Sequence, residues 1–380
     1  MKTNRKAPAL LASVAVVMAL SACGAAGQSS SPAQTTTAAV SAEDWSIDAE
    51  FTAKDGAVKA AAYKPAEKSS IKGDWKVCAL FPHVKDALWV SANYGNVAEA
   101  ERLGIQYNMF EAGGYGNLST QVDQMNDCIV QEYDAIVLGA ISAEGNCSSI
   151  QRALDASIVV VDFINGTACS KTVSENPKYT QVMVSYKETA ELIGKYMVEQ
   201  AAGKPRSVAV FPGPDGAAFA NDAVEGFTAS TKDSSVKTEV IRRGDTGLDV
   251  QLRLIEDALR AYPGATDVFG VDIAAEAGAV ALRNAGKSGQ VGVYGYTIIP
   301  NLYQAIVDGG ATAAVADWTP YQGRMAVSQA ARALEGQDLG GIRVGPQPEV
   351  VSKENAKDIA YEDMFGPASF KPIYELKSKS

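Results

Sequence analysis

The chain has 380 residues, 47% of them hydrophobic, and a formal net charge of −10. This length and this share of apolar residues are sufficient for about two domains with substantial cores. The acidic balance and the lack of a basic stripe argue against nucleic acid as a partner.

The N-terminus has the pattern of a bacterial export signal. Three basic residues stand among the first six, ahead of an apolar stretch at 10–20 that is too short to span a bilayer with those flanks. Small residues followed by Cys23 resemble a lipobox, in which the cysteine is lipidated; an ordinary signal peptide is the alternative. We therefore predict a lipoprotein signal peptide over 1–23 and a flexible, Ser/Thr/Ala-rich tether over 24–43.

The next segment, an N-terminal arm over 44–73, shows no clear period. Its aromatic residues Trp45 and Phe51 indicate that it packs against the rest of the protein. The sequence does not predict where.

From Lys76 onward, short runs of β-branched residues alternate with amphipathic stretches. The first half is predicted to hold strands at 76–81, 105–110, 135–139 and 158–162, and helices at 87–103, 118–131 and 147–155. After a long helix at 187–202, the second half is predicted to hold strands near 207–211, 236–241, 267–270 and 290–293, and helices near 217–230, 248–261, 274–285 and 302–308. This alternation is typical of parallel sheets covered by helices on both faces, so we predict an α/β fold with two Rossmann-like lobes.

Four cysteines besides Cys23 allow three disulfide pairings in an exported chain. In a sheet of strand order 2-1-3-4, the helix after the second strand crosses over the first strand. Cys78 on the first strand can then meet Cys128 on that helix, while Cys147 and Cys169 follow neighbouring strands. We predict Cys78–Cys128 and Cys147–Cys169, with buried free thiols as the alternative for the first pair.

Catalytic and metal-binding patterns are missing from the sequence. It holds one histidine, His83, and has no Gly-x-Ser-x-Gly elbow, no P-loop and no CxxC pair. We interpret His83 as a surface or loop-edge residue. We expect no enzymatic activity, no cofactor and no metal.

Residues that follow the predicted strands are rich in aromatic rings and carboxylates and poor in cations. In an open α/β sheet, ligands bind beyond the carboxyl ends of the strands. Aromatic faces attract cations and stack on sugar rings, so this edge suits a polar, neutral or cationic solute. By position, the predicted ligand-binding residues are Asp86, Trp89, Tyr115, Asp162, Asp272, Tyr296 and Asp317.

Each prediction has a structural alternative. Asp86 and Asp272 can serve as helix caps, and a cap can also bind ligand. Trp89 can face the core, and Tyr296 can pack between the lobes. Tyr115, in a glycine-rich loop, is hard to place in a core.

Several segments together resemble the TorT family of periplasmic sensors, a branch of the type I periplasmic binding proteins. They are Trp75–Pro82, Lys85-Asp86, Leu88-Trp89, Glu111–Tyr115, Pro212–Asp215 and Phe370–Tyr374. The resemblance implies two lobes joined by a three-strand hinge, with crossings near 184–186, 317–319 and 344–345. It also implies an aromatic box with an acidic residue, formed here by Asp86, Trp89, Tyr115 and Tyr296.

Two positions depart from that family's pattern. Leu88 stands where the family carries tyrosine, and Tyr186, also a predicted ligand contact, stands where it carries tryptophan. A site that loses a hydrogen-bonding partner can reject a solute strongly, which favours a solute other than trimethylamine N-oxide. The predicted lobes are 74–185 plus 319–345 and 186–318 plus 346–380.

These observations predict a solute-binding lipoprotein of the cell envelope, anchored on the outer face of the cytoplasmic membrane or in the periplasm. It would close on a sugar-like compound or a methylated amine and deliver it to an ABC permease. A lipobox is more typical of such receptors than of a soluble sensor partner. The alternative is a TorT-like sensor that presents its bound state to a membrane histidine kinase. In both cases the membrane is contacted only through the lipid anchor.

Overall fold

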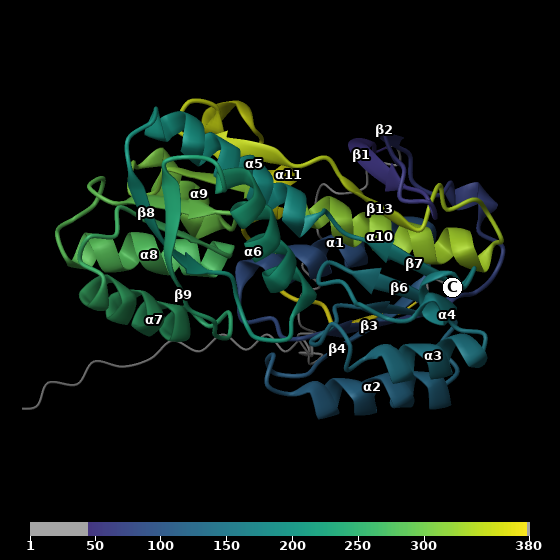
Figure 1. Cartoon of the computed structure of the whole chain (residues 1–380). Coiled ribbons are helices and arrows are strands. Elements are labelled where there is room, and N and C mark those ends of the chain that lie inside the picture. Colours follow the sequence, from purple (N-terminus) through teal and green to yellow (C-terminus); the bar gives the residue numbers. More distant parts are fainter. Residues whose placement is uncertain (1–44, 378–380) are drawn as a thin grey trace, which may run out of the picture. The chain divides into compact units, whose positions relative to one another are not determined.

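The computed structural model describes residues 45–377, which form two α/β lobes, each built on its own sheet (Figure 1). The predicted signal peptide, Cys23 and the tether lie outside the described residues. We call the nine-stranded sheet with its helices the first lobe and the six-stranded sheet with its helices the second lobe.

The first lobe is centred on five parallel strands in the order β4-β3-β5-β6-β7. These are β3 (Lys76–Phe81), β4 (Gln106–Glu111), β5 (Ala135–Leu138), β6 (Val159–Phe163) and β7 (Tyr179–Val182). Helices α1 (Ala87–Leu103) and α10 (Thr319–Leu334) cover one face, α2 (Leu118–Val130) and α3 (Cys147–Asp155) cover the other, and α4 (Lys171–Ser174) precedes β7. The predicted 2-1-3-4 order is confirmed.

The second lobe repeats the pattern in the order β14-β12-β11-β10-β8-β9. Its strands are β8 (Arg206–Phe211), β9 (Val236–Ile241), β10 (Asp267–Gly270), β11 (Gly292–Gly295), β12 (Ala313–Ala316) and the antiparallel β14 (Glu349–Ser352). Its helices are α5 (Tyr186–Ala201), α6 (Ala218–Thr231), α7 (Leu248–Ala261), α8 (Asp272–Asn284) and α9 (Pro300–Val307). Buried strands under helices on both faces explain the near-continuous apolar runs in the sequence.

Between β3 and β14 the chain passes from one lobe to the other three times. The first passage runs from β7 into α5, and the second from β12 into α10. The third runs from β13 (Arg343–Pro346) into β14. It falls just after the predicted crossing at 344–345, because these two residues still pair with strands of the first sheet. The three-strand hinge expected from the resemblance is present.

The N-terminal arm is a hairpin that extends the first sheet. Strands β1 (Ile47–Thr52) and β2 (Val58–Tyr63) pair with each other, and β1 pairs with β13. Trp45 stacks on Tyr63 with ring centroids 5.5 Å apart, and a short 3-10 turn, η1 (Lys68–Ser70), leads into β3. The arm therefore packs, as its aromatic residues indicated.

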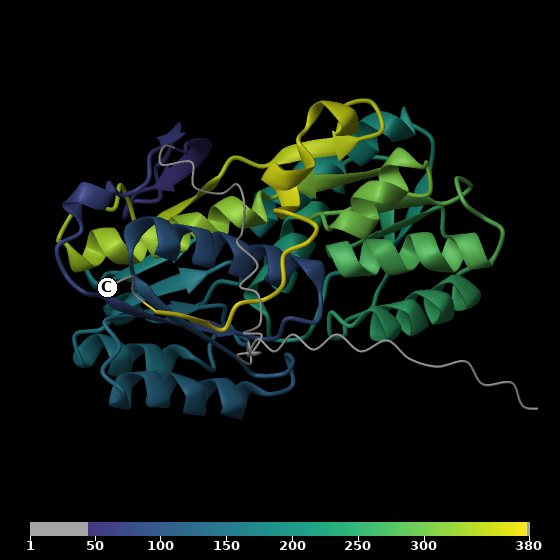
Figure 2. The same cartoon turned by 180° about the vertical axis from the view of Figure 1, so that it is seen from behind.

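The end of the chain departs from the predicted lobe boundary. After η2 (Ala356–Asp358) the chain turns toward the first lobe: α11 (Tyr361–Phe365) contacts α9 of the second lobe and α1 and α10 of the first, and β15 (Glu375–Leu376) pairs with β4. Figure 2 shows this yellow segment running back to the first lobe. The sequence predicts 346–380 in the second lobe, and for the end of the chain this prediction is wrong. The edge of β4 is free to pair, and β15 covers it.

Both predicted disulfides are present. Cys78 on β3 and Cys128 on α2 are buried, with Cα atoms 6.3 Å apart. Cys147 and Cys169 are partly exposed, with Cα atoms 5.4 Å apart. The strand order that predicted the first pairing brings α2 directly over β3.

Candidate ligand-binding site

A small cavity of about 20 Å³ lies where the carboxyl ends of the strands of the two lobes face each other. In this arrangement of the lobes the cavity has room for about one water molecule. From the first lobe it is lined by Asp86, Leu88, Trp89, Tyr115, Ile164 and Asn165, and from the second by Tyr186, Phe219, Thr246, Val271, Asp272, Tyr296 and Thr297. Six of the eight predicted ligand residues are in this set.

Aromatic rings from both lobes form much of the wall. Phe219 meets Tyr115 and Tyr186 edge to face at 5.9 Å, and Tyr186 meets Tyr296 at 6.1 Å. Trp89 packs on Phe81 with ring centroids 4.9 Å apart and also lines the cavity. It is therefore both a core residue and a cavity-wall residue, the two roles that the sequence allowed. Such walls fit an apolar or cationic part of a ligand.

Asp86 combines a structural and an electrostatic role. Its Oδ1 accepts from the Trp89 N–H at 3.1 Å and so caps α1, as the capping alternative expected. Burial raises the pKa of its carboxyl to about 7, with further upward contributions from Asp245 and Glu276.

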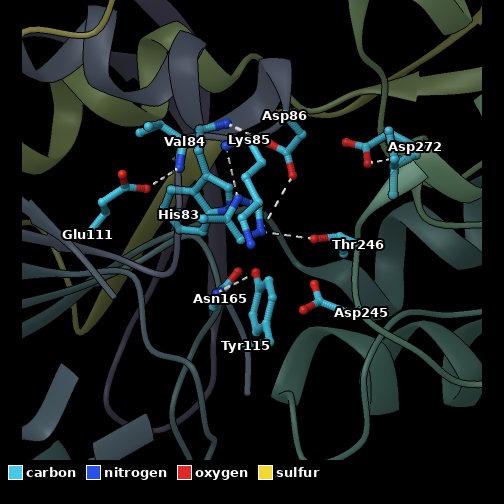
Figure 3. A network of polar contacts seen from close by, with 12 residues as sticks. His83, Val84, Lys85, Asp86, Glu111, Tyr115, Asn165, Asp245, Thr246 and Asp272 are labelled. Carbon is cyan, nitrogen blue, oxygen red and sulfur yellow. Dashed lines mark hydrogen bonds and ion pairs between the residues drawn. The ribbon is translucent and has the colours of Figure 1, made fainter. Parts of the chain in front are cut away.

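Asp272 lies across the cavity in the first turn of α8 and is 2% exposed. Its Oδ1 accepts from the Ile273 N–H at 2.6 Å, whereas its Oδ2 has no hydrogen-bond partner among the described residues. Burial raises its pKa well above the usual range, and the neighbouring carboxyls of Asp86 and Asp317 raise it further. Figure 3 shows Asp86 and Asp272 on facing elements.

None of the described residues that line the cavity carries a positive charge. Lys85, next to Asp86 in sequence, instead donates to the Gly113 carbonyl at 2.6 Å. Two buried carboxylates therefore face one space without a compensating cation from the wall. A ligand that supplies a positive charge or several N–H or O–H donors would satisfy them.

Comparison with known proteins identifies the family. A model of the periplasmic binding protein domain matches residues 77–338. This chain belongs to the periplasmic binding protein family. It is 33% identical to the periplasmic protein TorT of Escherichia coli K12 over 303 residues, which cover 80% of this chain and 85% of TorT.

Two solved structures of this family are also similar. An ABC transporter solute-binding protein from Bradyrhizobium sp. BTAi1 with bound Bis-Tris is 36% identical, with a TM-score of 0.72, and the match covers 87% of this chain and 98% of that one. In the complex of the TorS sensor domain with TorT in the presence of trimethylamine N-oxide, the matching chain is 25% identical, with a TM-score of 0.69 and coverage of 79% and 100%. These relatives are binding, transport or sensor proteins.

Periplasmic location is the family's property, and the structure adds one observation about membranes. Between residues 45 and 377, no helix combines the length and apolar character needed to cross a bilayer.

The prediction for His83 is wrong. The ring is 1% exposed, and its Nε2 lies 3.1 Å from Thr246 Oγ1 of the second lobe and 3.8 Å from Asp86 Oδ2 (Figure 3). Its Nδ1 accepts from the Lys85 N–H, so the neutral ring carries its proton on Nε2 and donates across the lobes. Burial lowers its pKa to about 4. Sequence position after a strand could not show that the other lobe covers it.

Two predicted ligand residues do not line the cavity. Asp162 lies within β6, with its side chain on the α2–α3 face, because residues alternate along a strand and Val160 packs there. It accepts hydrogen bonds from Thr167, Tyr179 and Gln181. Asp317, at the second hinge passage, accepts from Thr319 Oγ1 at 3.0 Å and from Gln322 Nε2 at 3.1 Å. Both residues therefore organise the scaffold.

Some cavity residues were missed by sequence reasoning. Ile164 and Asn165 follow β6 directly. The predicted strand ended one residue early, at Asp162, so these two residues were not among the predicted ligand contacts. Thr246 lies in the loop after β9, a strand end for which the sequence predicted no ligand residue. Phe219, in the first turn of α6, gave no positional signal at all.

Proposed function

We propose that this protein is an extracytoplasmic receptor that closes its two lobes on a small solute carrying a positive charge or clustered hydrogen-bond donors. The observation that carries the proposal is the pair Asp86 and Asp272. They come from different lobes and line the same aromatic-walled cavity, with the Asp86 side chain 7% and Asp272 2% exposed, and no cation is among the residues that line it. The proposed ligand contacts are these two residues with Trp89, Tyr115, Tyr186 and Tyr296.

Closure of the two lobes brings the carboxyl groups of Asp86 and Asp272 to the same cavity. Bringing two carboxyl groups together in a buried space is unfavourable when both are ionised. A cationic or donor-rich solute between them reverses the sign of that interaction and contacts both lobes at once. Binding then shifts the population toward the closed form, which is the motion such receptors use.

Delivery to an ABC permease is the partner function we propose. The similarity to an ABC transporter solute-binding protein over 87% of this chain supports it. Lipidation of Cys23 is part of the proposal, because an anchored receptor stays close to a membrane permease. The bound Bis-Tris of that relative, a hydroxylated tertiary amine, matches the chemistry of paired carboxylates.

A sensor that presents its closed form to a membrane histidine kinase is the second candidate. The 33% identity to TorT over 80% of this chain favours it. Leu88 and Tyr186, the two departures from the family's pattern, both line the cavity and favour a solute other than trimethylamine N-oxide. The two candidates share one binding site and differ in the partner.

The test is a ligand screen by thermal shift on the purified mature chain. The panel holds Bis-Tris, quaternary ammonium compounds, trimethylamine N-oxide, polyols and neutral sugars. A ligand at 100 times its Kd adds about 2.7 kcal/mol of stability. We expect hits among the amines. Hits confined to polyols and neutral sugars would assign the two carboxyl groups to O–H donors and not to a positive charge, and no hits at all would contradict the receptor. Co-purification with a permease or with a kinase ectodomain separates the two partners.

A further inference from the structure

One wall of the cavity is a turn in a backbone conformation that its residues do not prefer. Ile164 and Asn165 line the cavity just after β6. Ile164 has φ +63°, in the left-handed region that β-branched residues avoid. Such a conformation persists only when the surroundings hold it in place.

Hydrogen bonds fix this turn to the loop after β5. Asn165 Nδ2 donates to the Ala140 carbonyl at 2.8 Å and to the Tyr115 hydroxyl at 2.9 Å. The Ala168 N–H donates to the Ala143 carbonyl at 2.7 Å. The position of Tyr115, a second wall residue, thus depends on the same turn.

The loop after β5 also reaches the other lobe. The Ala143 N–H donates to the Gly216 carbonyl of the second lobe at 3.0 Å. The Cys147–Cys169 disulfide joins the ends of these two loops, since Cys147 begins α3 and Cys169 precedes α4. One covalent bond therefore ties the cavity wall to an inter-lobe contact.

We infer that the Cys147–Cys169 disulfide is a positioning element of the ligand site, so that opening it weakens solute binding. The inference rests on the proposed function. Reduction by a dithiol transfers two electrons and two protons to the bridge and leaves two thiols, while the dithiol closes into its own disulfide. The freed loops then allow Ile164 to leave its left-handed conformation and Asn165 to release Tyr115.

The second disulfide of the chain is the matched control. Cys78 and Cys128 are 0% and 1% exposed, and they join β3 to α2 within the core on the face away from the cavity. Cys147 and Cys169 are partly exposed, so a reductant reaches them in the folded protein. Removing either bridge lowers stability, but only one of the two supports the cavity wall.

The experiment compares two double variants, Cys147→Ser with Cys169→Ser and Cys78→Ala with Cys128→Ala. The unfolding temperature without ligand and the Kd for Bis-Tris by calorimetry are measured for each. We expect both variants to unfold at lower temperature. Only loss of Cys147–Cys169 should raise the Kd, by about tenfold, which corresponds to about 1.4 kcal/mol.

A second measurement on the unmodified protein covers the case in which a variant fails to fold. Brief dithiol treatment, with mass spectrometry to show that only Cys147 and Cys169 are reduced, should raise the Kd, and reoxidation should restore it. An unchanged Kd with the bridge open overturns the inference while the receptor proposal stands. Failure of the untreated protein to bind Bis-Tris or any other panel compound overturns the receptor proposal and this inference with it.

Discussion

Glu99 and Asp272 are both buried carboxylates, yet their surroundings differ completely. Glu99 is 0% exposed and accepts from Trp45 Nε1 at 2.8 Å and from Arg102 Nε at 2.9 Å, with Arg324 Nη1 at 3.9 Å. Asp272 is 2% exposed and faces Asp86 and no cation of the cavity wall. The same chain thus pairs a buried charge where it anchors the arm, and where the lobes meet it leaves two carboxyl groups without a positive partner, whose pKa burial raises.

This comparison shows how to separate a structural carboxylate from a binding one. Burial alone does not distinguish them, because both are equally hidden from water. The distinction lies in whether the protein itself supplies the opposite charge. Where it does not, a ligand is the natural source, because a lone buried charge costs several kcal/mol.

The largest effect is expected from breaking the paired cluster with Arg102→Met. The change leaves Glu99 with a weakened ion pair and removes the donor to the Ala66 carbonyl of the arm. We expect a loss of about 3–5 kcal/mol in the free energy of unfolding, measured with urea. Arg260→Met, in an exposed ion pair with Asp257, is the control and should cost less than about 1 kcal/mol. Equal losses would show that burial of the pair carries no special weight.

The next largest effect is expected from Asp272→Asn, which replaces the buried carboxyl that has no cation beside it in the cavity wall. Because burial raises the pKa of Asp272 and so favours its neutral form, the neutral amide should leave ligand-free stability equal or higher, while affinity for a quaternary ammonium probe falls about hundredfold. Calorimetry and urea unfolding measure the two quantities.

The control for this variant is Asp267→Asn, at the opposite end of β10. Asp267 is buried beside Arg206, with Asp267 Oδ1 and Arg206 Nη2 3.2 Å apart. It should lose stability and keep affinity. The reverse pattern in the two variants would contradict the distinction between paired and unpaired carboxylates.

Much of the fold was predictable because it depends on local pattern. Alternating apolar strands and amphipathic helices give two parallel sheets, and the strand order follows from connectivity rules. The arm was not predicted as a hairpin, although Ile47, Ala49 and Phe51 do alternate with polar residues in β1. The alanine-rich β2 shows no such alternation, so its pairing with β1 became visible only in the structure.

The candidate site was predictable only in part because it is a property of two lobes. Strand ends gave Asp86, Trp89 and Asp272, since position along a parallel strand fixes which residues reach the edge. The burial of His83 depends on Thr246 from the other lobe, 163 residues away. No pattern around either residue encodes that contact.

The smallest predicted effect is a pH dependence of binding. Burial raises the pKa of Asp86 to about 7, so its ligand-free carboxyl loses its proton between pH 6 and pH 8. A cation binds the ionised form of Asp86, so at pH 6 binding must first release the proton of this carboxyl. With a pKa of about 7, binding is about tenfold weaker at pH 6 than at pH 8. The probe is a quaternary ammonium, whose own charge does not titrate.

The raised pKa of Asp86 also determines how the stability of the ligand-free protein changes with pH. The folded state keeps a proton on Asp86 that the unfolded state loses above its ordinary value of 3.8, so the contribution of this group to stability falls as pH rises through about 7. Its charged or titratable neighbours are His83, Asp245, Asp272 and Glu276. Asp86→Asn should flatten the binding profile between pH 6 and pH 8. A profile that keeps its slope in this variant would assign the proton to another group, with Asp272 as the next to test because it shares the cavity and its pKa is also raised.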